Sequence, residues 1–454
     1  MTNLSEANLN NGAAVGPQGD GMDSPSSFPA YPTYKDSGVE WLGVVPENWA
    51  LGSLKHLAWI RNGRDYKEVE SPDGEYPVIG SGGQFANATR YLYDGESVLL
   101  GRKGTIDKPL YIHGRFWTVD TMFYTEVTAG ASAKFLYYNA LTIPFQYYST
   151  STALPSMTQG DLLNHPCAIP ALEEQIQIAR FLDHETARID ALIEDQQRLI
   201  ELLKEKRQAV ISHAVTKGLD PTVPMKDSGV EWLGEVPAHW YISNVKRVAN
   251  IRYGIGEPPQ YHPEGMPLIR ATNVHAGKLF SQGLVFVDPA EIPARRIVWL
   301  EPGDIVVVRS GAYTGDSAII PNEYGPCIAG FDMVLRCHSA RPDFIQFALL
   351  SKYLKEGQLD LEKMRAAQPH LNAEELGACM LVLPGMEEQI RIVEFLQMRC
   401  AEFDILMTEA DQAKSLLQER RSALVSAAVT GKIDVRGWQP PASARTPELV
   451  EEAV

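Results

Sequence analysis

The sequence predicts an α+β protein in which two α/β domains are separated by two long helices, and these helices pair as an antiparallel coiled coil. Two repeats carry this prediction. The stretch KDSGVEWLGVVPENW at residues 35–49 recurs as KDSGVEWLGEVPAHW at residues 226–240. A second stretch, PALEEQIQIARFL from Pro170, recurs as PGMEEQIRIVEFL from Pro384. Two separate stretches repeated in the same order indicate an internal tandem duplication, and two copies are too few for a solenoid.

The repeats divide the chain into six segments. We expect, in order, a disordered leader (1–30), a first domain (31–165), a central helical region (166–220), a second domain (221–380), a C-terminal helical region (381–438) and a flexible tail (439–454). The leader is polar and rich in Gly, Pro, Ser and Asn, a composition that cannot bury a core. No long apolar stretch or signal-peptide core occurs, which favours a cytoplasmic protein.

Each helical region is a run without Gly or Pro that begins after Pro170 or Pro384 and ends near Gly218 or Gly431. Apolar residues within it step by three and four, which is typical of a coiled-coil seam. The predicted seam of the first helix, interrupted at Gln196 and Lys206, is Ile189, Leu192, Leu199, Leu203 and Val210. The predicted seam of the second, with Arg420 at the place of Lys206, is Phe403, Leu406, Ala410, Ala413, Leu417 and Leu424. The alternative is that each helix packs only on its own domain.

Both large segments share a turn, a buried strand and a basic Gly-rich loop. In the first the strand is residues 97–100 and the loop is 101–105; in the second the strand is 304–308 and the loop is 309–315. Glycine lets the backbone approach a ligand closely, and Arg beside Ser or Thr suits phosphates and guanine edges. A surface hairpin with an incidental Arg explains either loop alone, but its occurrence in both segments favours a binding function.

Together these features resemble the DNA-specificity subunit of type I restriction-modification enzymes over about residues 31–438. The motifs are W-L-G-x-V-P-x-x-W at 41–49 and 232–240, P-x-x-E-E-Q-I at 170–176 and 384–390, G-D-I-V-V-V-R-S-G at 303–311 and T-G-K-I-D at 430–434. The first domain carries a looser version of the strand and loop.

The resemblance implies a non-catalytic subunit without a cofactor. Each domain would read one half of a split DNA site, while the helices fix the gap and dock two methyltransferase subunits, joined in the full enzyme by motor-nuclease subunits. A half of the subunit that binds one of two identical partner subunits must be present twice to bind both. The four signature tryptophans, Trp41, Trp49, Trp232 and Trp240, are then expected to be apolar anchors.

On this resemblance we expect DNA contacts from polar and basic residues of both domains. In the first domain they are Arg102, Lys103, Thr105 and Lys108, then Arg61, Arg64, Tyr66, Ser81 and Gln84. In the second they are Arg309, Ser310, Tyr313 and Thr314, then Arg270, Thr272, Asn273, Gln368 and His370. Arg can read guanine, and Asn or Gln can read adenine, with two hydrogen bonds each.

The formal charge of −16 argues against a free-standing nucleic-acid binder. The acid is concentrated in the leader, the repeats and the helices, and both large segments are nearly neutral, so DNA binding with a cationic partner remains open. No nucleotide-binding loop, methyltransferase motif or metal-ligand spacing occurs. Two alternatives stay open: a specificity subunit of a fused restriction-methyltransferase system resembling type IIB, and a protein-binding coiled-coil scaffold.

Overall fold

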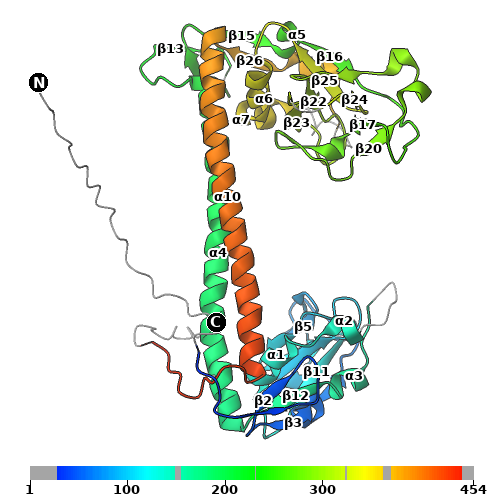
Figure 1. Cartoon of the computed structure of the whole chain (residues 1–454), viewed down its shortest axis with the longest axis vertical. Coiled ribbons are helices and arrows are strands. Elements are labelled where there is room, and N and C mark those ends of the chain that lie inside the picture. Colours follow the sequence, from blue (N-terminus) through cyan, green and yellow to red (C-terminus); the bar gives the residue numbers. More distant parts are fainter. Residues whose placement is uncertain (1–27, 149–154, 231, 323–324, 361–369, 442–454) are drawn as a thin grey trace, which may run out of the picture. The chain divides into compact units, whose positions relative to one another are not determined.

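The computed structural model describes residues 28–148, 155–230, 232–322, 325–360 and 370–441. Most of the predicted leader and tail lies outside these residues. The chain divides into two compact units, one formed by Met1–Asp195 with Ala413–Val454 and the other by Gln196–Gln412. Each unit contains one β-rich domain and a part of each long helix, coloured green and orange in Figure 1.

The first unit contains two four-stranded sheets. One sheet has the order β4-β11-β8-β9, all antiparallel; the other has the order β6-β5-β10-β7, with β5 and β10 parallel. The strands are β4 (Ala58–Asn62), β5 (Tyr76–Gly80), β6 (Gly83–Ala88), β7 (Tyr93–Asp94), β8 (Ser97–Gly101), β9 (Leu110–Ile112), β10 (Arg115–Thr118) and β11 (Met122–Val127). The helices beside them are α1 (Ala133–Ala140), α2 (Phe145–Tyr148) and α3 (Gln159–Leu163).

The second unit repeats this topology with a different sequence. Its sheets have the orders β16-β25-β22-β23 and β20-β17-β24-β21, again with one parallel pair, β17 and β24. The strands are β16 (Ala249–Tyr253), β17 (Met266–Ile269), β18 (Val274–His275), β19 (Lys278–Leu279), β20 (Val285–Val287), β21 (Trp299–Leu300), β22 (Ile305–Val307), β23 (Ser317–Ile319), β24 (Cys327–Ala329) and β25 (Met333–Cys337). The helices are α5 (Val245–Val248), α6 (Pro342–Leu350), α7 (Lys352–Leu354) and α9 (Ala373–Ala378). The duplication therefore includes both domains, each of which is rich in strands.

A short two-stranded sheet closes each domain where the chain enters and leaves it. In the first unit β3 (Ala50–Ser53) pairs with β12 (Pro166–Ile169), and in the second β15 (Tyr241–Asn244) pairs with β26 (Met380–Leu383). The entering strand directly follows the repeated signature, and the leaving strand directly precedes a long helix. Each domain is thus an insertion between two adjacent strands.

The repeated signature forms a β-hairpin in each unit. Strands β1 (Tyr34–Asp36) and β2 (Val44–Pro46) pair in the first, and β13 (Met225–Asp227) and β14 (Glu235–Pro237) in the second. The glycines Gly38 and Gly43 have φ of +68° and +62°, and the matching glycines of the second hairpin have similar values. Such left-handed backbone is accessible to glycine at little cost, which explains why the D-S-G and L-G elements recur.

The signature and the E-E-Q motif recur together because they bond to each other. The indole Nε1 of Trp49 donates to Glu174 Oε1 at 3.0 Å, and in the other unit Trp240 Nε1 donates to Glu388 Oε2 at 3.0 Å. Both indoles are at most 1% exposed. A buried donor without a partner costs about 1–3 kcal/mol, so each Trp requires its Glu. The expectation of apolar anchors thus holds for these two tryptophans, whereas Trp41 and Trp232 are 48% and 44% exposed.

The glutamine of the motif joins the helix start to the domain. Gln175 Nε2 donates to the Pro170 carbonyl at 2.9 Å, and its Oε1 accepts from the backbone N–H of Ser132, which caps α1, at 2.9 Å. Gln389 makes the same two bonds in the second unit, to Pro384 and from Arg341. The helix therefore starts at a fixed orientation against its domain in both copies.

The two long helices are α4 (Leu172–Lys217) and α10 (Met386–Val429). Gly218 and Gly431, which follow them, have φ of +78° and +70°, consistent with the predicted glycine termination. Within each unit the helices lie side by side and antiparallel (Figure 1): Asp190 bonds Arg421 in the first, and Arg207 lies 3.6 Å from Asp404 in the second. The predicted pairing of two long helices is confirmed.

The predicted seam is correct at alternate positions and wrong at the others. Ile189, Leu203, Phe403 and Leu424 are buried, and Val210 and Leu417 pack at the edges of the cores. Leu199 and Leu406, by contrast, are 43% and 46% exposed. The seam passes one residue later at each such step. Ile200, Arg207 and Met407 are more buried than Leu199, Lys206 and Leu406. Ile193, and not Leu192, packs against the core, and Arg421, and not Arg420, pairs with Asp190. The predicted heptad period is correct, but the predicted order of three-residue and four-residue steps along each helix is the reverse of the observed order.

The core of each unit joins the domain to both helices. In the first unit one cluster includes Trp49, Phe181 of α4 and Leu424 of α10; in the second, another includes Trp240, Ile211 of α4 and Ile392 of α10. Helix pairing and domain folding are therefore coupled within a unit. No helix among the described residues is long and apolar enough to cross a bilayer.

Candidate nucleic-acid interface

The basic loops of the two domains leave equivalent strands and are held in the same way. Arg102 follows β8, and Arg309 follows β22 after Val308. The next residue in each loop forms a β-bridge to the segment before a short helix. Lys103 pairs with Ser156, before α3, and Ser310 pairs with His370, before α9. The loops therefore occupy the same place on the shared fold while carrying different side chains.

A glycine at the end of a neighbouring strand lets the backbone close tightly at this edge. A Cβ on Gly63 would lie 2.0 Å from the carbonyl oxygen of Val119, and one on Gly254 would lie 1.9 Å from that of Gly330. No side chain can be accommodated at such a distance. Each glycine follows an exposed arginine-containing strand end, at Arg61 or Arg252, so the close approach brings that strand end toward the basic loop.

Arg309 lies between two aromatic rings. The centre of its guanidinium group is 4.6 Å from the ring of Tyr253 and 4.2 Å from that of Phe331. Its Nη2 is 3.4 Å from His370 Nε2, and its Nε has no hydrogen-bond partner among the described residues. The two rings hold the guanidinium group in place, with Nη2 against His370 and Nε buried. An arginine positioned in this way suits recognition of a base edge or a phosphate.

A buried carboxylic acid lies beneath this arginine. Asp332 is 2% exposed, and its Oδ1 accepts a hydrogen bond from the Arg309 backbone N–H at 3.1 Å. Burial raises the pKa of Asp332 to about 6, although the backbone bond and the charge of Arg309 lower it. Asp332 thus orients the start of the basic loop and is a residue that the sequence prediction missed.

Three further predicted residues of the second domain lie beside one another in the chain but differ in exposure. Arg270 Nη2 donates to the Gly283 carbonyl at 2.7 Å, with its guanidinium group 5.5 Å from the Tyr261 ring, and Thr272 is exposed. Asn273 is fully buried and bonds the Arg270 N–H at 3.2 Å and the Phe280 carbonyl at 3.0 Å. The prediction that Asn273 reads adenine is therefore wrong for this structure, because its amide holds the backbone.

The loop after Arg309 exposes Tyr313 and hides Thr314. Tyr313 is 46% exposed, with its ring 5.1 Å from that of His275. Thr314 is 1% exposed, and its hydroxyl donates to the Gly311 carbonyl at 2.7 Å. The predicted base contact from Thr314 is corrected accordingly: this side chain shapes the turn that presents Tyr313.

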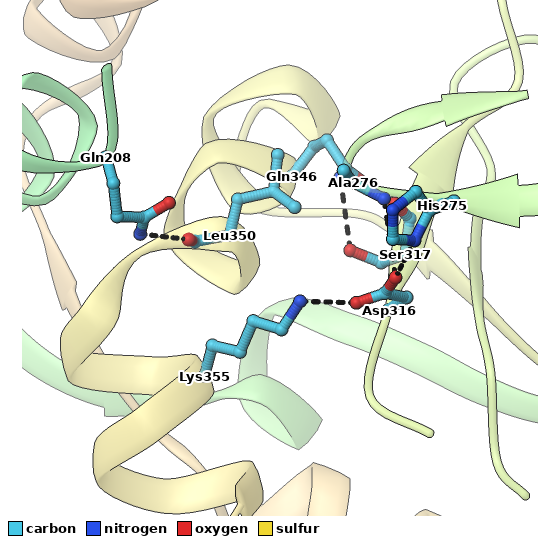
Figure 2. Close-up of polar contacts among 8 residues, drawn as sticks. All are labelled: Gln208, His275, Ala276, Asp316, Ser317, Gln346, Leu350 and Lys355. Atoms are coloured by element: carbon cyan, nitrogen blue, oxygen red, sulfur yellow. Dashed lines mark hydrogen bonds and ion pairs between the residues drawn. The ribbon is translucent and has the colours of Figure 1, made fainter. Parts of the chain in front are cut away.

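Asp316 anchors the end of this loop (Figure 2). Its carboxylate accepts from Lys355, in the helical turn Lys355–Leu359, and lies 2.6 Å from His275 Nδ1 in β18. Burial alone would raise the pKa of Asp316, but the bonds and charges of Lys355 and His275 outweigh it and keep the pKa below its ordinary value. No sequence pattern links these three residues, because they come from separate elements.

Polar contacts continue from this anchor toward the long helix. Gln346 of α6 donates to the carbonyl and hydroxyl oxygens of Ser317 at 3.2 and 3.1 Å, and Gln208 of α4 donates to the Leu350 carbonyl at 2.6 Å (Figure 2). The basic loop of the second domain is therefore fixed to α6, and α6 is fixed to the helix pair in the same unit.

In the first domain the basic loop is more open. Arg102 Nη1 donates to the Asp120 carbonyl at 3.2 Å, and its guanidinium group lies 5.9 Å from the Phe123 ring. Lys103, Thr105 and Lys108 are exposed. Their charge is available to a polyanion at this edge.

The second set of predicted residues in the first domain is partly engaged. Arg61 is paired with Glu126 at 3.0 Å, Tyr66 packs edge-on against Phe85, and Gln84 Nε2 donates to Asn87 Oδ1 at 2.8 Å. Arg64 is exposed and Ser81 half-buried. The predicted Gln368 of the second domain lies outside the described residues.

Among the described residues, no group of three or more His, Cys, Asp or Glu side chains is placed to hold a metal ion. Many of the side chains at the two edges are hydrogen-bond donors or aromatic rings, the types that contact phosphates and stack on bases.

Comparison with known proteins agrees with this assignment. The profile of the family described as "Type I restriction modification DNA specificity domain" matches residues 46–202. The MjaVIII type I restriction enzyme specificity subunit of Methanocaldococcus jannaschii is 22% identical over 422 residues, covering 86% of this chain and 94% of the relative. The EcoKI specificity subunit of Escherichia coli K12 is 23% identical over 451 residues, covering 90% and 93%.

The fold is also shared with a solved structure. A chain from a study of complex assembly and conformational transition in a type I restriction-modification system aligns with a TM-score of 0.65 at 15% identity, covering 86% of this chain and 99% of the other. The arrangement of two β-rich domains and two paired long helices is therefore shared with that chain. Together with the family profile and the relatives above, it defines a DNA-specificity protein. More particularly, residues 46–202 carry the type I restriction-modification DNA specificity domain, and along most of its length the chain is similar to the non-catalytic specificity subunits of type I restriction enzymes.

Proposed function

We propose that the two β-rich domains, within residues 31–165 and 221–380, each read one half of a bipartite, non-palindromic DNA site. The observation that carries this proposal is the equivalence of the two edges. Both domains have the same strand orders and hold a basic loop at the same place, yet one loop offers Arg102 and Lys103 where the other offers Arg309 and Ser310. The same strand framework carrying different loop side chains suits recognition of two different half-sites.

Mapping of modified bases across the host genome, with and without the gene, tests this proposal. We expect a motif of two short specified sequences separated by an unspecified spacer, lost when the gene is deleted. A hybrid in which residues 221–380 come from another specificity subunit should change one half of the motif only. An unchanged methylation pattern after deletion would favour the protein-binding scaffold.

We also propose that the chain docks two methyltransferase subunits and, in the full cytoplasmic complex, motor-nuclease subunits. The support is the internal sequence repeat. Each signature, E-E-Q motif and helix pair makes the same contacts in its own unit. A partner subunit that binds this surface in one unit can therefore bind the equivalent surface in the other unit as a second copy. A partner that carries nuclease and methyltransferase motifs in one polypeptide would instead favour the fused system.

The charge of the chain leads to a binding experiment. Because the net charge is −16 and phosphate neutralisation supplies much of DNA affinity, the isolated subunit should bind DNA weakly. Fluorescence anisotropy with a duplex of the mapped motif should show tight, specific binding only after the methyltransferase is added. Tight specific binding by the isolated chain would contradict this view.

The helix pair is proposed to set the length of the spacer. Matched insertion of one heptad into α4 after Asp195 and into α10 after Gln412 preserves the seam and adds about 10 Å of helix. The spacer should lengthen by about three base pairs at roughly 3.4 Å each, with both half-sites unchanged. A spacer of unchanged length would refute the role of the helices.

A further inference from the structure

Each unit carries a tryptophan that is neither buried nor part of the DNA-facing edge. Trp41 and Trp232 occupy the same position of the two signatures and are 48% and 44% exposed. The next residue, Leu42 or Leu233, is buried in both units. The signature therefore fixes the backbone and presents the indole outward twice.

In the first unit Trp41 forms one wall of a pocket of about 110 Å³. Its indole stacks on His165 at a ring separation of 5.9 Å and an angle of 11°. The pocket is also lined by Ser426 in the last turn of α10 and by Thr430, which directly follows this helix. Burial lowers the pKa of His165 to about 4, so this stacked ring is uncharged at neutral pH.

In the second unit Trp232 lines a wider pocket of about 570 Å³. Its indole stacks on Tyr353 at a ring separation of 6.3 Å and an angle of 14°. The facing wall is the last turn of α4, with Ser212 and Thr216. These two positions are the same members of the helix repeat, S-x-A-V-T, as Ser426 and Thr430 in the first pocket. Both pockets thus share the signature Trp and the two helix positions, whereas the ring stacked on the Trp differs between them.

The duplication identifies what the pockets receive. The DNA-facing loops differ between the units, so a DNA half-site does not call for two equivalent pockets. A segment of this chain would have to be present twice, yet the residues outside the described ranges, 1–27, 149–154, 231, 323–324, 361–369 and 442–454, contain no repeated stretch. A ligand that arrives as two copies of one protein fits both pockets.

The chemistry of the walls points to an apolar side chain. The Thr216 hydroxyl donates to the Ser212 carbonyl at 2.7 Å, and the Ser212 hydroxyl accepts from the Lys352 N–H at 2.9 Å. The helix wall of the second pocket therefore has its hydroxyls engaged. Lys217, Lys352 and Glu356 also line this pocket, and its apolar surface includes the exposed Trp232 indole. None of the described residues lining the first pocket is Lys or Arg, so that pocket offers nothing to a phosphate. Tryptophans in such pockets are frequent hot spots of protein interfaces.

We propose that the two pockets each receive an apolar or aromatic side chain from one of two identical methyltransferase subunits, with Trp41 and Trp232 as the anchors. This inference rests on the proposed docking of two methyltransferase subunits and assigns the point at which each is held. Because the pockets lie in separate units, losing one leaves the other intact.

The test measures how many methyltransferase subunits bind. The complete specificity subunit and the methyltransferase of the same system are mixed, and complex mass is measured by mass photometry over a concentration series. We expect two methyltransferases per wild-type chain, one for Trp41→Ala or Trp232→Ala, and none at the same concentrations for the double variant. Each single loss should weaken binding at that pocket at least tenfold.

Matched controls separate the pockets from exposed tryptophan in general. Trp59→Ala and Trp299→Ala remove indoles that are 58% and 43% exposed elsewhere on the same units, and they should leave two methyltransferases bound. Ser426→Arg fills the first pocket from the helix wall and should reproduce Trp41→Ala, while circular dichroism verifies that each variant folds.

The outcomes distinguish this inference from the proposal beneath it. If the wild-type chain binds two methyltransferases and the double variant also binds two with wild-type affinity, the anchor role of the pockets is refuted while the docking proposal stands. If the wild-type chain binds a number other than two, the docking proposal itself fails.

Discussion

The Asp190 carboxylate accepts two hydrogen bonds from the Arg421 guanidinium group, at 2.8 and 3.2 Å. The second unit carries the same relationship with the helices exchanged, because Arg207 of α4 lies 3.6 Å from Asp404 of α10. Asp404 also accepts a bond from Lys278 of the second domain at 2.7 Å. Arginine at a seam position is thus matched by an acid on the facing helix in both units.

Reversing one charge of the first pair should destabilise the first unit, and reversing both should restore it. Asp190→Arg places two guanidinium groups opposite one another, whereas Asp190→Arg with Arg421→Asp recreates the pair. Because both side chains are partly exposed, the coupling free energy should be about 1 kcal/mol. Urea unfolding of the four proteins of this cycle measures it, and a coupling near zero would contradict the pairing.

Removing the glutamate that binds the buried indole should loosen one unit at a time. Glu174→Ala leaves both the Trp49 N–H and the Tyr31 hydroxyl, which donates to Glu174 at 2.7 Å, without a partner. The first unit should lose about 2–4 kcal/mol of stability. Hydrogen exchange should rise in that unit, and Glu388→Ala should have the same effect on the second. Amide protection unchanged from the wild type in both variants would show that the Trp–Glu hydrogen bond contributes little to stability.

Truncating the stacked arginine should relax one half of the DNA motif. Arg309→Ala should cost about 1–3 kcal/mol per lost base contact in the second domain, and Arg102→Ala should act on the other half-site. The two variants control for each other, since each should leave the other half of the mapped motif unchanged. Binding of duplexes with single base changes in each half-site provides the measurement. An equal loss for all sequences would indicate a phosphate contact instead.

Acid should destabilise the first unit through His165. The unfolded histidine titrates near 6.5, whereas burial lowers the pKa of His165 to about 4 in the folded state. The unfolded state therefore binds more protons between these values, and stability is lost as pH falls through that window. Urea unfolding should show about 2 kcal/mol of this loss between pH 7 and pH 5.

His165→Gln is the control for the pH prediction, because glutamine does not titrate. The variant should show a correspondingly weaker pH dependence over the same interval, whatever its stability at pH 7. An identical pH dependence in both proteins would assign the acid sensitivity to other groups.

The sequence predicted the long helices well and their contact face less well. Positions 192 and 193 are both apolar, and so are positions 199 and 200. Apolar spacing alone therefore allows either order of three-residue and four-residue steps along the seam. The partner decides between them: Arg207, and not Lys206, reaches Asp404. Such pairings depend on residues about two hundred positions away in the chain, which periodicity does not encode.

The DNA-facing edge was predicted in position but not in detail. Strand-loop patterns located Arg102 and Arg309, whose loops occupy equivalent places in the fold. Residue type did not reveal that Asn273 and Thr314 are buried, because their hydrogen bonds to Phe280 and Gly311 form only in the folded loops. Asp316 and Asp332 were missed because nothing in their local sequence distinguishes a buried anchor from an exposed turn residue.

The paired strands at the base of each domain have an evolutionary consequence. Ala50 lies opposite Ile169, and Tyr241 lies opposite Leu383, so each domain enters and leaves its unit through neighbouring hydrogen-bonded strands. Genetic recombination that breaks the gene within the duplicated signature and helix segments would therefore exchange a whole domain as a cassette. The lineage could acquire new sequence preferences in one step while its helices and partner contacts remain unchanged.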